Sequence, residues 1–158
     1  MKTTKLLASV SIAIIGLTMT ATPLSAEAND NAPSAHKEGH VLGSYNLVAT
    51  ALYKDDLATA KKAAKEILEH DKNGSLTASA QKLSEAATIE EARKVFNALS
   101  AAAIKVAKTE QAYKVAHCPM ANGGKGGKGG DWLQSSSDKI VNNPYFGAKM
   151  AHCGSFKN

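Results

Sequence analysis

Residues 88–113 read TIEEARKVFNALSAAAIKVAKTEQAY, and this stretch carries the most regular apolar pattern in the chain. Its apolar residues mostly recur at spacings of three and four, which place them on one face of a helix. That face consists of Ile89, Ala92, Phe96, Leu99, Ala103, Val106 and Tyr113. Thr88, followed three residues later by Glu91, forms a capping box. The pattern predicts a helix that opens at Thr88 and reaches about residue 116.

Three shorter apolar stripes with similar spacing precede this helix, at residues 41–52, 57–67 and 76–87. Asp55 or Asp56 can cap the second of them, and Asn73-Gly74 ends it. Amphipathic helices joined by short loops bury their apolar faces most simply against one another. We therefore expect an all-α protein built as an antiparallel four-helix bundle.

The C-terminal residues follow a Gly-rich stretch, GGKGGKGG, at residues 123–130. This stretch lacks the Lys-Ser or Lys-Thr pair of a phosphate-binding loop, so it predicts a flexible connection. Half of the aromatic residues come after it: Trp132, Tyr145, Phe146 and Phe156. Because an Ala-rich bundle buries little apolar area, we expect an irregular aromatic C-terminal segment, with one or two helical turns, that packs on the bundle.

The N-terminus has the features of an export signal. Two lysines precede an apolar run at residues 6–19, and small residues follow it. This pattern predicts a signal peptide over residues 1–26 and a periplasmic or secreted protein that has no membrane anchor after cleavage. Residues 27–37 are polar and predict a loose tail, which leaves residues 38–158 as one helical domain.

The composition and the motifs argue against two classes of function. The net charge of +5 falls to +3 without Lys2 and Lys5 of the predicted signal peptide. With lysines spread over the helix faces, this charge is too mild for a nucleic-acid-binding surface. Asp55-Asp56 suits helix capping better than acid–base chemistry, and His117 and Cys118 are chain neighbours that rarely face each other. We therefore expect no enzyme.

The sulfur-bearing residues that remain after signal cleavage form two pairs, Cys118 with Met120 and Met150 with Cys153. Pro119 favours an extended conformation at Cys118, in which Cys118 and Met120 would share a face. Met150 and Cys153 are three residues apart and would share a face on a helical turn. Each pair can therefore present two sulfur atoms in one direction.

Two thiolates and two thioethers form a soft ligand set, which favours Cu(I). Zn(II) is the other candidate if His117 and His152 replace the methionines. These two histidines adjoin the cysteines and are expected to be supporting or exchangeable ligands. The predicted site therefore consists of Cys118, Met120, Met150, Cys153, His117 and His152.

A disulfide between Cys118 and Cys153 is the alternative, because two cysteines in an oxidising compartment most often pair. Closing the loop between them would stabilise the fold by about 4 kcal/mol in the chain-entropy model. The protein would then be a non-enzymatic structural or interaction module. The methionine beside each cysteine favours the metal site, and the two interpretations remain open at this point.

Several segments resemble the helical domain family that accompanies CusB-type heavy-metal efflux adaptors. The resemblance is most specific near the C-terminus and covers nearly all of residues 41–157. It is carried by Cys118-Pro119-Met120-Ala121, Trp132-Leu133, Asn143-Pro144-Tyr145-Phe146-Gly147, Met150 and Cys153-Gly154, and in the helices by Ala51-Leu52, Asp55-Asp56, Ile89-Glu90-Glu91-Ala92-Arg93, Phe96 and Leu99-Ser100. The resemblance implies a role in copper or related heavy-metal handling, with an efflux adaptor or another periplasmic metal protein as partner.

Overall fold

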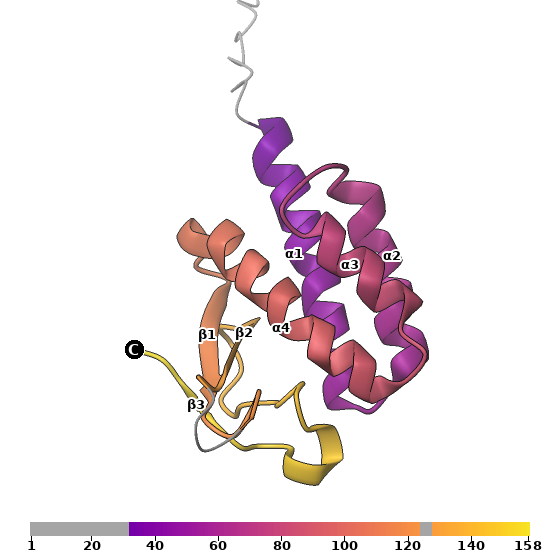
Figure 1. Ribbon diagram of the computed structural model, residues 1–158. Helices are drawn as coiled ribbons and strands as arrows, with labels where there is room; N and C mark the ends of the chain where they lie inside the picture. Colours follow the sequence, from indigo (N-terminus) through magenta and orange to yellow (C-terminus); the bar gives the residue numbers. More distant parts are fainter. Residues whose placement is uncertain (1–31, 124–127) are drawn as a thin grey trace, which may run out of the picture.

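The computed structural model describes residues 32–123 and 128–158, and four helices make up its first half (Figure 1). The helices are α1 (Ala32–Tyr53), α2 (Leu57–His70), α3 (Thr77–Glu85) and α4 (Ile89–Val106). The predicted caps are confirmed. The Asp56 carboxylate accepts the Thr59 N–H at 2.9 Å, and the Thr88 hydroxyl accepts the Glu91 N–H at 3.2 Å. Each cap satisfies a backbone donor that the first helical turn leaves without a partner.

The helical core is built from the predicted apolar stripes. α2 packs on α1 and α3, while α4 packs on α1, on α3 and on the C-terminal half of the chain. The largest side chains of this core are fully buried: Tyr45, Leu42, Leu52, Ile67, Leu76, Leu83, Phe96 and Leu99. Alanines fill the space between them and allow the helices to approach closely.

The expectation of an all-α protein is wrong, because the C-terminal half contains an antiparallel sheet. α4 ends at Val106, a short 3-10 helix follows at Ala107–Thr109, and the chain then forms β1 (Tyr113–Cys118), β2 (Gly130–Ser135) and β3 (Ser155–Phe156) in the order β2-β1-β3. The fold is therefore mixed α and β. Residues 113–116, which the sequence analysis places at the end of the fourth helix, belong to the central strand.

A physical reason for this error lies in the residues around Tyr113. Tyr113 continues the helical stripe only by its spacing from Val106, since the residues between them are mostly polar or small. Tyr and Val are typical of strands, and Pro119 favours extended backbone just before it. Residues 113–118 pair with β2, from Tyr113 opposite Ser135 to Cys118 opposite Gly130. This pairing stabilises a strand rather than a helix at these residues.

The first helix is longer than expected. α1 begins at Ala32, so residues 32–37 are helical although the sequence predicts them as part of a loose tail. Pro33 does not prevent this, because a proline in the first turn lacks only an N–H that has no helical partner there. The predicted signal peptide, residues 27–31 of the predicted tail and residues 124–127 of the Gly-rich stretch lie outside the described residues.

Buried hydroxyl groups join the sheet to the helices. The Tyr45 hydroxyl accepts the Leu133 N–H at 3.1 Å and donates to the Ser100 Oγ at 2.6 Å, and the Ser100 hydroxyl donates to the Asp131 carbonyl at 2.8 Å. Leu133 and Asp131 belong to β2, which is one of the two edge strands. The hydroxyls of Tyr45 and Ser100 therefore occupy backbone groups that would otherwise be open to another strand. Burial raises the pKa of Tyr45 far above its ordinary value, which keeps the phenol protonated.

The predicted packing of the aromatic residues on the bundle is confirmed. Trp132 is fully buried, and the Tyr145 ring lies edge-on to the rings of Phe96 and Trp132, with centroid distances of 5.4 and 6.0 Å. The C-terminal segment is not irregular throughout as expected, because β2 and β3 belong to it, and a 3-10 turn at Gly147–Met150 lies between these two strands. Within residues 32–123 and 128–158, no helix combines the length and apolar character that crossing a membrane requires.

Candidate functional site

The two cysteines meet between the end of β1 and the C-terminal segment. Cys118 is the last residue of β1 and is fully buried, whereas Cys153 follows the 3-10 turn and is half-buried. Their Sγ atoms lie 3.2 Å apart although the residues are 35 positions apart in the chain. Both are free thiols in this structure. The convergence of two distant sulfur-bearing segments, which the sequence analysis expects, is therefore present for the cysteines.

The separation of the sulfur atoms lies between two bonded arrangements. A disulfide requires about 2.05 Å, so the atoms would have to approach by about 1.2 Å. A tetrahedral metal with bonds of about 2.3 Å holds two sulfur atoms about 3.8 Å apart, so they would have to separate by about 0.6 Å. Small side-chain rotations can produce either change.

Cys118 and burial together affect the ionisation of Cys153. The hydrogen bond with Cys118, together with burial and the charge of a neighbouring thiolate, raises the pKa of Cys153. Near neutral pH, Cys153 is therefore a protonated thiol. A metal bound by both sulfur atoms would displace their protons, so its apparent affinity would increase with pH.

The two methionines are placed differently from each other. Met120 is 47% exposed on the turn after β1, in which the Cys118 carbonyl accepts the Ala121 N–H at 3.3 Å. Cys118 is extended as predicted, but the backbone turns at Pro119, so the strand alternation that would place Cys118 and Met120 on one face ends at Cys118. Met150 ends the 3-10 turn, and its carbonyl accepts the Cys153 N–H at 3.1 Å. This turn has the three-residue spacing that the sequence predicts.

Each histidine of the predicted site has its Nδ1 atom in a hydrogen bond. His117 Nδ1 lies 2.6 Å from the Asp131 carboxylate, and His152 Nδ1 donates to the Val141 carbonyl at 2.8 Å. His117 precedes Cys118 on β1, and successive strand residues point to opposite faces. The His117 imidazole is therefore directed away from the thiol pair.

Asp131 joins His117 to the C-terminus. Its second carboxylate oxygen accepts a hydrogen bond from Lys157 Nζ at 2.6 Å. Burial raises the pKa of Asp131, but the hydrogen bonds from Lys157 and His117 outweigh it and lower the pKa below its ordinary value. Within the described residues, no group of three or more His, Cys, Asp or Glu side chains is arranged to hold a metal ion. Among these residue types, the site therefore consists of the two cysteines.

An ion pair between Arg93 and Asp55, which no sequence pattern indicates, anchors the segment carrying Cys153. The guanidinium of Arg93, in α4, contacts the Asp55 carboxylate and donates to the carbonyls of Leu52 at 2.7 Å and Pro144 at 3.1 Å. The second oxygen of Asp55 accepts the Ala148 N–H at 3.0 Å. The pKa of the Asp55 carboxyl is lowered, mainly by its hydrogen bond from Arg93. Asp55 thus ties the C-terminal segment to the helices, although its sequence position suggests only a cap.

Gly147 makes this contact possible. Its φ of +54° is in the left-handed region, and a Cβ there would collide with the Arg93 guanidinium and the Asp55 carboxylate. In the sequence, Asn143-Pro144 and Gly147 stand out only as part of the C-terminal motif that carries the resemblance. The helical residues that carry the resemblance, Asp55 and Arg93, therefore contact the C-terminal motif directly in the fold.

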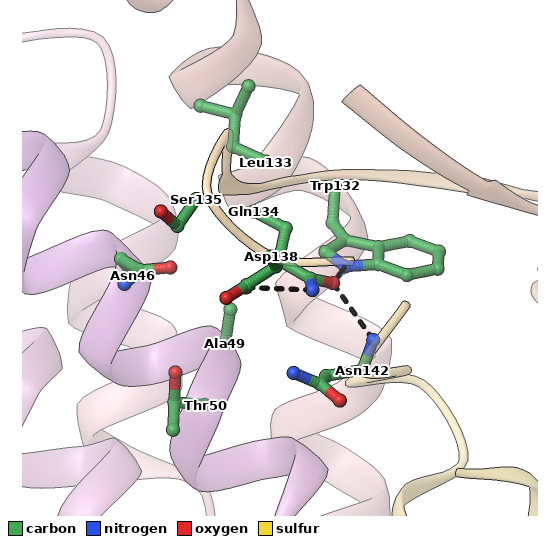
Figure 2. Close-up of a pocket in the computed structure, with 9 residues that line it drawn as sticks. All are labelled: Asn46, Ala49, Thr50, Trp132, Leu133, Gln134, Ser135, Asp138 and Asn142. Atoms are coloured by element: carbon green, nitrogen blue, oxygen red, sulfur yellow. Dashed lines mark hydrogen bonds between the residues drawn. The ribbon is translucent and has the colours of Figure 1, made fainter. Parts of the chain in front are cut away.

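A hollow of about 260 Å³ lies apart from these residues, between α1 and β2 (Figure 2). Gln134 organises its wall. The Gln134 Nε2 donates to Asp138 Oδ2 at 2.8 Å, and the Gln134 Oε1 accepts the Asn142 N–H at 2.9 Å and the Trp132 indole N–H at 3.3 Å. No sulfur atom or imidazole lines this hollow, so it is not part of the thiol site.

We found no family model, no curated protein and no solved structure that matches the chain. Functional inference therefore depends on the geometry of the thiol pair and on the sequence features around it.

Proposed function

We propose that this is an exported protein that binds a soft metal ion, Cu(I) above all, through Cys118 and Cys153. It would sequester the ion or deliver it to a heavy-metal efflux partner. The observation that supports this proposal is the 3.2 Å separation of two free thiols from distant parts of the chain. Two sulfur atoms held this close act as a preformed chelate, because the fold has already lost the entropy of bringing them together.

The burial of the two cysteines suits an exchangeable ion. Cys118 is inaccessible to solvent, while Cys153 is half-buried and gives one route to the pair. A carrier must exclude competing ligands from the ion and still release it to a partner. One buried and one half-buried cysteine meet both needs.

The number of donors favours Cu(I) over Zn(II). Structural zinc sites take four protein ligands, and the described residues bring no third His, Cys, Asp or Glu to the thiols. Cu(I) accepts a lower coordination number and prefers thiolate and thioether sulfur. Met150, on the turn that leads into Cys153, and Met120, on the turn that leaves Cys118, are the candidates for a further ligand.

Two sequence features support the rest of the proposal. The predicted signal peptide supports export, and the resemblance to the domain that accompanies CusB-type adaptors supports a heavy-metal efflux partner. Thioethers carry no proton and resist the oxidation that removes thiols, so they suit a periplasmic copper site.

A competition titration tests the proposal. The reduced exported protein is titrated with Cu(I) against a chromophoric Cu(I) chelator, and Cys118→Ser and Cys153→Ser are compared with it. Each substitution should weaken Cu(I) binding by more than the 10- to 100-fold that loss of an outer-shell partner typically costs. Met120→Leu and Met150→Leu should weaken it less and show which thioether takes part. Wild-type affinity in both cysteine variants would contradict the proposal.

A permanent disulfide is the second candidate, because the sulfur atoms need to approach by only about 1.2 Å. The protein would then be a structural or interaction module without metal. A free-thiol count on protein taken from the exported fraction, together with elemental analysis, separates the two. Two free thiols with bound copper support the carrier, whereas no thiols and no metal support the module.

A further inference from the structure

Cys153 is held in a segment that folds back on itself around one buried side chain. We call residues 143–156 the C-terminal clamp. Asn143 is fully buried at its base. The Asn143 Nδ2 donates to the Cys153 carbonyl at 2.7 Å, and its Oδ1 accepts the N–H groups of Tyr145 at 2.8 Å and Phe146 at 3.3 Å.

The backbone of Asn143 closes the same ring. Its N–H donates to the Ala151 carbonyl at 2.8 Å, and its carbonyl accepts the Gly147 N–H at 3.1 Å. The side chain and the backbone of one residue therefore bind both the start of the clamp and the residues around Cys153. Such a buried amide fixes the loop only as long as its hydrogen bonds remain complete.

The far side of Cys153 is held by β1. Gly154 has a φ of +129°, and a Cβ there would lie 2.5 Å from the His117 carbonyl oxygen, so the clamp contacts the strand backbone directly. The next two residues, Ser155 and Phe156, pair with His117 and Ala116. Cys153 is thus placed between Asn143 and β1, and Cys118 is the next residue of that strand.

We propose that Asn143 is the positioning residue of the thiol pair. Its hydrogen bond to the Cys153 carbonyl sets how often the Cys153 sulfur lies against the Cys118 sulfur. The two sulfur atoms can be joined through a metal or as a disulfide. Either bond stabilises the docked clamp, and the docked clamp stabilises the bond, because coupling between two equilibria is reciprocal. The metal half of this inference rests on the proposed function, and the disulfide half does not.

The thiol–disulfide equilibrium measures the coupling without a metal. In a glutathione buffer, the two thiols lose two electrons and two protons to one glutathione disulfide, which yields two molecules of glutathione. Asn143→Ala should lower the equilibrium constant for the internal disulfide at least about tenfold, which corresponds to a reduction potential about 30 mV less negative. Asn143→Asp, which keeps an oxygen for Tyr145 and Phe146 but removes the donor to Cys153, should lower it as well.

Asn142→Ala is the matched control. The Asn142 side chain makes no hydrogen bond within the described residues, and its backbone N–H keeps its bond to Gln134. This variant should retain the wild-type equilibrium constant. Equal constants for Asn143→Ala and Asn142→Ala would overturn the inference, because a merely structural role destabilises the reduced and oxidised proteins equally.

Hydrogen exchange of the unmodified protein gives a second test that does not depend on a variant that folds. Oxidation of the pair should slow exchange of the Tyr145 and Phe146 amides by a larger factor than exchange in α2. Equal factors would contradict the coupling. If the Asn143 variants shift the disulfide equilibrium while the wild-type protein fails to bind Cu(I), the proposed function is wrong and the positioning role stands.

Discussion

Replacing Arg93 tests whether the helices hold the C-terminal half of the protein through one buried guanidinium. The Arg93 side chain is only 10% exposed and donates to the carbonyls of Leu52 and Pro144. A hydrogen bond from a charged group contributes about 1.5 kcal/mol or more, so these two bonds contribute about 3 kcal/mol. The Asp55 side chain is 42% exposed, so the ion pair itself adds no more than about 1 kcal/mol.

Arg93→Ala should therefore lower the free energy of unfolding of the reduced protein by about 3 kcal/mol. Arg93→Lys should recover part of this loss, since an ammonium group cannot reproduce the planar fork of the guanidinium. Lys94→Ala, at the exposed neighbouring position in α4, is the control and should stay within about 0.5 kcal/mol of wild type. Urea unfolding followed by circular dichroism and by Trp132 fluorescence gives these values. A loss below about 1 kcal/mol in Arg93→Ala would refute the anchoring role.

Three further predictions concern the thiols, acid and the buried hydroxyl network. Oxidising Cys118 and Cys153 to a disulfide should raise the free energy of unfolding by up to about 4 kcal/mol in urea titrations, and an unchanged value would show that the fold does not accommodate the bond. The pKa values of Asp55 and Asp131 are lowered in the folded protein, so their contribution is present above the ordinary value of 3.8 and is lost as the pH falls through the folded values. Stability measured from pH 5 to pH 2 should therefore fall, and more gently in Asp55→Asn. Tyr45→Phe leaves the Leu133 N–H buried without its acceptor and should cost about 2 kcal/mol in thermal or urea unfolding.

The helical half of the fold is predictable because its signals are local. The caps at Asp56 and Thr88, and the stop at Asn73-Gly74, depend on residues within one turn of the helix end. The sheet is not predictable in this way. Its longer strands, Tyr113–Cys118 and Gly130–Ser135, have six residues each and gain their stability by pairing with each other across the Gly-rich connection. A short strand that depends on a distant partner leaves little periodicity in its own sequence.

The same distinction explains what sequence reasoning finds at the candidate site. The sulfur pairs are visible because Cys and Met are rare, and their chemistry needs no structural context. The geometry around the sulfur pairs cannot be seen in the sequence. Pro119 begins a turn that directs the chain away at Met120, and strand alternation directs His117 away from Cys118. Arg93 and Asn143 were missed because their roles consist entirely of contacts with residues far away in the sequence or with backbone groups.

The anchoring of the C-terminal clamp bears on the choice between carrier and structural module. Asn143, the pair of Arg93 with Asp55, and the pairing of β3 with β1 all hold Cys153 in place while both cysteines are free thiols. A disulfide used only for stability would itself hold the clamp, which would make much of this network redundant. A metal site has the opposite need, since its ligands must be held in place before the ion arrives and after it leaves. Non-covalent contacts that preorganise two reduced thiols are therefore more useful to a protein that exchanges an ion than to one that is permanently cross-linked.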